Sequence, residues 1–156
     1  MKEYNSDLID VLRQFPHMPK PDSKLETKLF ERLKDDEVLA DCATLGLMTE
    51  IYCKDHHDKN GREALYSPAS VLGAYEGKRH PKLCPECADH VIYGETRRAL
   101  CSYDPKPNCK SCKTHCYKAD QRAHQRKVMA YSGPRAMLYP HLWVDTFRHL
   151  RNKTKN

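Results

Sequence analysis

The chain has 156 residues, of which 39% are hydrophobic and 8% aromatic, so it is long enough for one domain with a modest core. Its net charge is +6, from 27 Lys and Arg against 21 Asp and Glu, which favours a soluble surface with some attraction to anions over a dedicated nucleic-acid face. The sequence shows neither a signal-peptide pattern nor a run of about 18 apolar residues, so we expect a cytoplasmic protein without a membrane span.

Eight cysteines are the most unusual feature of the composition, and six of them lie between residues 83 and 117. In a cytoplasmic protein they are expected to be reduced. Reduced cysteines in clusters favour metal ligation over a disulfide framework. Because the core is modest, bound metal would also add stability.

Residues 1–22 read as an N-terminal helix followed by a proline-rich arm. The helix is predicted over residues 5–15, with Asn5 or Ser6 as its cap, and three prolines within the next six residues end it. The sequence does not decide whether this arm docks on its own chain or on a second subunit.

Two further helices are predicted before residue 53. Ser23 and Glu26 resemble a capping box for a helix that ends near Lys34, and a second helix runs from residue 35 or 36 to residue 52. The two could also form one continuous helix. Cys42 falls on the apolar side of the second helix, so we expect it in the core and not at a metal.

The first predicted metal site combines the end of this helix with a later Cys-x-x-Cys pair. Cys53 is followed by His56 and His57, where side chains at a helix end can converge on an ion. The pair in Cys84-Pro85-Glu86-Cys87 lacks two ligands, and Pro85 suits the first turn of a helix. We therefore predict a structural zinc site formed by Cys53, His57, Cys84 and Cys87. His56 and His90 are alternatives to His57 as the histidine ligand.

Residues 58–81 join the two halves of this site. They begin with a turn and continue as a loop-rich segment, in which Ser67-Pro68 predicts the start of a brief helix.

The stretch between Cys87 and Cys101 contains no proline and has apolar residues at helical spacing. A helix of these 14 steps would separate the two cysteines by about 21 Å, which one metal ion cannot span. The remaining cysteines are therefore assigned to a second site, which holds an iron-sulfur cluster (4Fe-4S) or zinc and is formed by Cys101, Cys109, Cys112 and Cys116. Their spacing does not choose between these two groups.

The C-terminal part is predicted to be helical as well. A helix over residues 118–131 would stop at Ser132-Gly133-Pro134-Arg135, interpreted as a corner, before a last apolar helix over residues 137–150 that is interrupted at Tyr139-Pro140. Residues 151–156 read as a basic tail. The fold class is thus mainly α: a small irregular helical domain over residues 23–150, stapled by two cysteine-rich metal sites.

Several of these motifs together carry a family resemblance. They are Ile51-Tyr52-Cys53, Cys84-Pro85-Glu86-Cys87, Cys109-x-x-Cys112-x-x-x-Cys116-Tyr117, Val128-Met129, Ser132-Gly133-Pro134-Arg135 and a closing helix from Pro140 to Leu150. Over roughly residues 36–150 the chain resembles the small bacterial family named for a nitrous oxide-stimulated promoter. It departs from the usual family form at Thr114, where members have proline, and at Ala136, where they have methionine; neither is a proposed ligand.

The resemblance implies a role in nitric oxide stress and an iron-sulfur cluster, because nitric oxide attacks iron-thiolate centres. Some members lack the first Cys-x-x-Cys but keep the equivalents of the other four cysteines. This implies that the second cysteine set carries the shared function and that the first set is structural. Residues 1–34 lie outside the resemblance.

Two other classes of function agree less well with the sequence. A zinc-stabilised nucleic-acid-binding transcriptional regulator would contact phosphates through basic side chains, namely Arg122, Arg126, Lys127, Arg135 and those of the basic tail. However, no recognition helix or aromatic platform is identifiable in the sequence. An enzyme is disfavoured, because no nucleophile with a paired base, no glycine-rich phosphate loop and no carboxylate pair stands out. A protein partner, the physiological target and the oligomeric state stay open.

Overall fold

The computed structural model describes residues 6–107, 109 and 111–140. Along these residues the chain forms, in order, α1 (Ser6–Arg13), α2 (Lys24–Arg32), α3 (Asp36–His56), β1 (Glu63–Ala64), α4 (Pro68–Val71), β2 (Lys82–Leu83), α5 (Pro85–Ala99) and α6 (Ala119–Ala136). The predicted mainly helical fold is confirmed. Among the described helices, none combines the length and the apolar composition that a membrane span requires.

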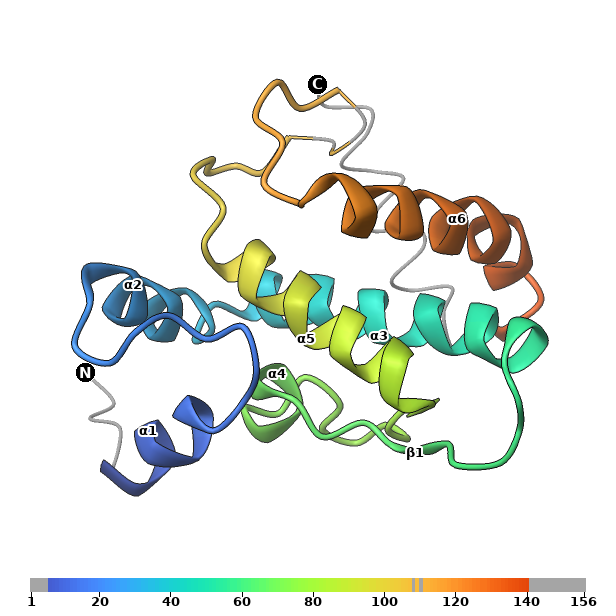
Figure 1. The fold of residues 1–156 in the computed structure, drawn as a ribbon, viewed down its shortest axis with the longest axis horizontal. Coiled ribbons are helices and arrows are strands. Elements are labelled where there is room, and N and C mark those ends of the chain that lie inside the picture. Colours follow the sequence, from blue (N-terminus) through green and yellow to red (C-terminus); the bar gives the residue numbers. More distant parts are fainter. Residues whose placement is uncertain (1–5, 108, 110, 141–156) are drawn as a thin grey trace.

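Helix α3 is the centre of the fold, and α5 and α6 both pack along it (Figure 1). Its start is fixed by Asp35, whose carboxylate accepts hydrogen bonds from the backbone N–H groups of Glu37 and Val38. Residues on all sides of α3 are buried, so its polar side chains must find partners inside the protein. Thr44 and Thr49 do so by donating to the carbonyls of Ala40 and Leu45, one turn earlier.

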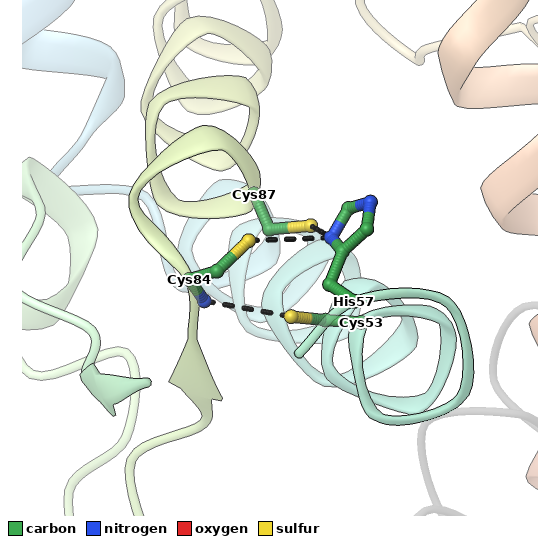
Figure 2. A group of neighbouring side chains, drawn as sticks. All are labelled: Cys53, His57, Cys84 and Cys87. Carbon is green, nitrogen blue, oxygen red and sulfur yellow. Dashed lines mark hydrogen bonds between the residues drawn. The ribbon is translucent and has the colours of Figure 1, made fainter. Parts of the chain in front are cut away.

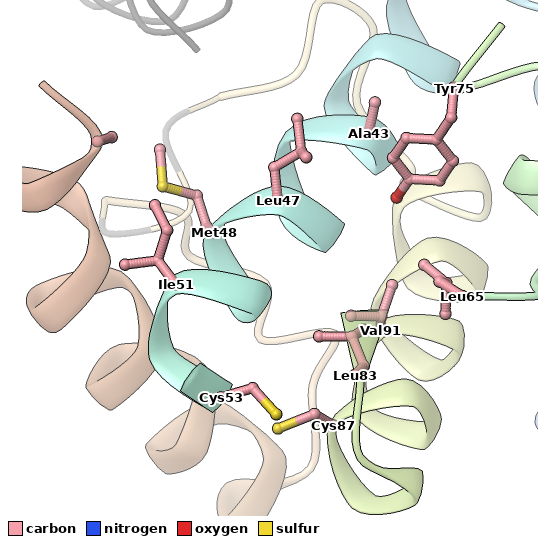
Figure 3. Packing of buried hydrophobic residues seen from close by; sticks show 11 residues of the cluster. Ala43, Leu47, Met48, Ile51, Cys53, Leu65, Tyr75, Leu83, Cys87 and Val91 are labelled. Atoms are coloured by element: carbon pink, nitrogen blue, oxygen red, sulfur yellow. The ribbon is translucent and has the colours of Figure 1, made fainter. Parts of the chain in front are cut away.

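The main hydrophobic cluster joins α3 to α5 and to the short β-hairpin of β1 and β2 (Figure 3). The two strands pair antiparallel, with Glu63 opposite Leu83. Cys53 and Cys87 belong to this cluster and point towards each other at one end of it. The buried members are Ala43, Leu47, Met48, Ile51, Cys53, Leu65, Tyr75, Leu83, Cys87, Val91 and Ala136. Cys42 lies in a second cluster with 1% of its surface exposed, which confirms its predicted place in the core.

The segment between β1 and β2 is fastened to α5 by Glu95, a carboxyl group with no exposed surface. The hydroxyl of Ser67 donates to it at 2.8 Å and the backbone N–H of Ala69 donates at 3.1 Å. Ser67 also caps α4, as its position before Pro68 predicted. Burial raises the pKa of Glu95 to about 7.

The N-terminal arm docks on its own chain. Leu12 and Phe15, at and after the end of α1, pack with Ile92 of α5. Arg13 reaches the buried carboxylate of Glu26 at 2.6 Å, which ties α1 to α2. The predicted capping box forms in part: Ser23 accepts from the backbone N–H of Glu26. The carboxylate of Glu26 serves Arg13 and the backbone of Asp22.

Helix α2 ends at Arg32 and α3 begins at Asp36, so the two are separate helices. Helices α1 and α2 precede the part of the chain that carries the family resemblance, and they cover one side of α5.

The predicted corner at residues 132–135 is wrong, because α6 continues through Gly133 and Pro134 to Ala136. Packing against α3 explains the difference: Ala136 is fully buried, and the buried Ser132 hydroxyl donates to the carbonyl of Met48 at 2.7 Å. These contacts hold the last turn in place although proline cannot donate a backbone hydrogen bond there. Of the last predicted helix, residues 137–140 are described and form no α-helix, whereas residues 141–150 and the basic tail lie outside the described residues.

Candidate metal centre

Three elements bring the first four predicted ligands together (Figure 2). The last turn of α3 carries Cys53, and His57 is the first residue after that helix. Strand β2 leads directly into Cys84, the N-cap of α5, and Pro85 at the first helical position turns Cys87 back towards α3.

The ligand atoms of the four residues all lie within 4.8 Å of one another. The Nδ1 atom of His57 is 3.2 Å from the Sγ atoms of both Cys84 and Cys87. The backbone N–H of Cys84 points at the Sγ of Cys53, 3.4 Å away. In a tetrahedral zinc site with bonds of about 2.3 Å to sulfur and 2.0 Å to nitrogen, neighbouring ligand atoms are about 3.6 Å apart. The arrangement therefore fits a metal ion with three sulfur ligands and one nitrogen ligand.

The electrostatics of the thiols also call for a cation. Burial raises the pKa of Cys87, and the negative charges of Cys53 and Cys84 raise it further. Burial likewise raises the pKa of Cys53. Three thiolates at this distance are stable together only beside a positive ion, whose binding releases their protons.

The other candidate histidines are engaged elsewhere. The Nδ1 atom of His56 lies 3.0 Å from the carbonyl of Tyr52, and its ring stacks on the Tyr52 ring. The buried His90 places its two ring nitrogens 2.7 Å from the side-chain oxygens of Gln121 and Gln125 on α6. His57 is thus the histidine whose ring nitrogen faces the thiols.

The second cysteine group has a looser arrangement. Cys101 follows Leu100, the C-cap of α5, and the described residues of 101–118 form no helix or strand. Cys109 and Cys116 are exposed, whereas Cys101 and Cys112 are half-buried. Among the described residues, the first four ligands are the one group of side chains placed closely enough to hold a metal ion, so the second group is not gathered in the same way.

These four cysteines nevertheless share one region of the molecule. Although Cys116 is exposed as a residue, partial burial of its thiol raises its pKa, and the negative charges of Cys109, Cys101 and Cys112 add to this shift, so all four thiols are near enough to interact. A hydrogen bond from Cys112 Sγ to the carbonyl of Thr114 shapes the loop locally. The predicted spacer between the two cysteine groups is present as α5, with Cys84 and Cys87 at its start and Cys101 past its end.

The polar residues that surround the first site could not be recognised in the sequence. Glu50, Arg62 and Arg79 bind one another or the backbone across gaps of 5 to 32 residues. Such contacts depend on the fold and leave no local pattern in the sequence.

Comparison with known protein families matches residues 36–156 to the family described as nitrous oxide-stimulated promoter. The chain belongs to this family. The match to the nitrous oxide-stimulated promoter family begins at the first residue of α3 and includes all the cysteines of both predicted sites. No curated protein and no solved structure matches the chain.

Proposed function

We propose that the protein is a metal-binding factor of the nitrosative-stress response. A structural zinc ion would be held by Cys53, His57, Cys84 and Cys87, and an iron-sulfur cluster (4Fe-4S) or zinc would be held by the second cysteine group. The observation that supports this most directly is the approach of His57 Nδ1 to two thiols at 3.2 Å. The name of the family supports the link to nitrogen oxides.

The first site has the chemistry of a structural zinc centre. Three thiolates and one imidazole give zinc its preferred four ligands and leave no open position for a substrate. Cys53 and Cys87 are fully buried in the main cluster, so an ion here would join the end of α3 to the start of α5. Its binding free energy would then contribute to the stability of the fold.

The second site supplies four cysteines and no histidine ligand, which suits an iron-sulfur cluster as well as zinc. The exposure of Cys109 and Cys116 gives small molecules access to these thiols. An iron-thiolate centre reacts with nitric oxide, so a cluster held there would give the protein a means of sensing or scavenging it.

Metal analysis of protein purified without oxygen tests the proposal. We expect one zinc per chain together with a brown colour, iron and acid-labile sulfide. Cys112→Ser should remove the iron and sulfide and keep the zinc, whereas Cys87→Ser should remove the zinc. If either change removed both metals, the two sites would not be separate.

A colourless protein with two zinc ions and salt-sensitive DNA binding would instead support the nucleic-acid-binding regulator. The exposed basic side chains of Arg126, Lys127 and Arg135 on α6 are the candidates for phosphate contacts in that case. Arg135 already makes a cation–π contact within the chain, because its guanidinium lies 3.6 Å from the ring centre of Tyr131.

A further inference from the structure

His57 reaches the thiols from a position outside α3, so its backbone needs support of its own. Arg62 provides this support: its Nη2 atom donates to the carbonyl of His57 at 2.6 Å and to the carbonyl of Lys54 at 3.1 Å. Its Nε atom donates to the carbonyl of Asp58 at 3.0 Å. The Lys54 carbonyl is one of the last four of α3, which have no partner within the helix, and a cation is favoured at this end of the helix dipole.

Cys84 is held from the opposite side by Glu50, which lies one turn before Cys53 on α3. Glu50 is 3% exposed and accepts two hydrogen bonds from Arg79, at 2.8 and 2.7 Å. It also accepts the backbone N–H of Lys82 in β2 at 2.8 Å. Burial by itself would raise the pKa of Glu50, but the hydrogen bonds from Arg79 and Lys82 outweigh it and hold the pKa below its ordinary value. The ionised carboxylate thus ties β2 to α3 two residues before Cys84.

We propose that Arg62 and Arg79 are positioning residues for the metal site: Arg62 holds the backbone of His57, and Arg79, through Glu50, holds the strand that delivers Cys84. This inference rests on the proposed metal binding by the first site. Each arginine uses its planar fork to bridge two or more oxygen atoms, which lysine cannot reproduce. Ligands fixed in advance lose less conformational entropy when the ion binds.

The test compares Arg62→Lys and Arg79→Lys with Arg126→Lys, a matched change at an exposed arginine of α6. All are made in the full chain with Cys109→Ser, Cys112→Ser and Cys116→Ser, so that the second cysteine group keeps one thiol and forms no competing site. Co²⁺ serves as the probe, because cobalt bound by thiolates has its own charge-transfer absorption. Affinity is measured by competition with a chelator, and release is measured from the loaded protein into excess chelator.

We expect the Arg62 and Arg79 variants to bind Co²⁺ about 10- to 100-fold more weakly and to release it faster, with Arg126→Lys unchanged. The double variant should lose about the product of the two factors, since the arginines support different ligands. Glu50→Gln, which keeps an oxygen for the Lys82 N–H but removes the charge, should match Arg79→Lys. The unfolding midpoint of the metal-free variants should change less than the affinity does.

Two results would contradict the positioning role and leave the proposed zinc site intact. One is a Co²⁺ affinity of the Arg62 and Arg79 variants equal to that of Arg126→Lys. The other is a loss of affinity that is explained entirely by lower stability of the metal-free protein. If the parent protein bound no Co²⁺ through its thiols, the proposed zinc site itself would be wrong.

Discussion

The hydroxyl of Tyr75 lies against the backbone of Gly46, in the place where a side chain at that position of α3 would begin. Tyr75 is 1% exposed, and among the described residues its hydroxyl has no hydrogen-bond partner. Glycine is therefore required at this point of α3 by the close approach of the segment that follows α4.

Gly46→Ala should destabilise the protein by about 2 kcal/mol, because its Cβ would overlap the Tyr75 hydroxyl in a packed core. Tyr75→Phe should cost little, since it removes a buried hydroxyl that lacks a partner. In the Tyr75→Phe background, Gly46→Ala should cost less, although the ring carbon at 3.2 Å and Pro81 at 3.3 Å still restrict the space. Denaturant unfolding at equal metal loading measures all three.

Gly133→Ala is the matched control in the same protein, because no atom of the described residues lies within 4 Å of a Cβ at that position of α6. It should stabilise the protein by up to about 1 kcal/mol through better helix propensity. Equal losses for the two glycine variants would contradict the role given to Tyr75.

Glu95→Gln should change how stability depends on pH. The pKa of Glu95 is about 7 in the folded protein, above the ordinary value of 4.5, so the folded state holds its proton more tightly than the unfolded state does. The stabilisation that comes from the protonated Glu95 is fully present below about pH 4.5 and is lost as the pH rises through about 7. The total change in unfolding free energy is about 3 kcal/mol. Glutamine does not titrate, so the variant should gain stability relative to the parent between pH 5 and 8.

The measurement is the difference in unfolding free energy between parent and Glu95→Gln at a series of pH values and equal metal loading. Other titrating groups contribute equally to both proteins and cancel. A difference that stays constant over this range would show that Glu95 is ionised throughout.

Pro134→Ala should stabilise α6 by about 1 kcal/mol or more. Proline lacks the N–H group that would bond to the carbonyl of Ala130, and alanine restores it at an exposed position. Ser132→Ala, two residues earlier, should do the opposite, because it removes the hydrogen bond to Met48. Thermal unfolding of the two variants decides this, and a loss of stability in Pro134→Ala would argue that residues 132–135 prefer a corner after all.

Cys42→Ala should leave the metal content unchanged, whereas Cys53→Ala on the same helix should remove the zinc. Cys42 is buried among apolar side chains, and burial raises the pKa of its thiol well above the ordinary value, which disfavours the ligand form. Zinc analysis of the two purified variants compares them directly. Loss of zinc from both would mean that the effect comes from general unfolding and not from a lost ligand.

The sequence predicted what depends on local spacing. The helices around residues 36 and 85, the cap at Ser67 and the core position of Cys42 all follow from patterns within a few turns of chain. The grouping of Cys53 and His57 with Cys84 and Cys87 was predicted because each half lacked ligands that the other supplied, and the structure brings the four together. The second cysteine site stays a prediction.

What could not be predicted depends on contacts between distant residues. Ser132-Gly133-Pro134-Arg135 looks like a corner when read alone, and its helical form is decided by packing on Met48. The hydrogen bond between Arg79 and Glu50, beside the candidate metal site, spans 29 residues, and nothing near either residue indicates it. The sequence likewise did not indicate whether the N-terminal arm docks on its own chain, because this depends on the packing of Leu12 against Ile92, 80 residues later in the chain.

Cys101 differs from the other three cysteines of the second group in how it is attached. It follows the C-cap of α5, a helix anchored at its other end beside the first metal site, so its position is set by the rest of the protein. Cys109, Cys112 and Cys116 belong to an irregular loop. Binding of the cluster proposed for this group would therefore order the loop around a thiol that α5 already holds in place, and the conformational entropy lost by the loop residues would be its main cost.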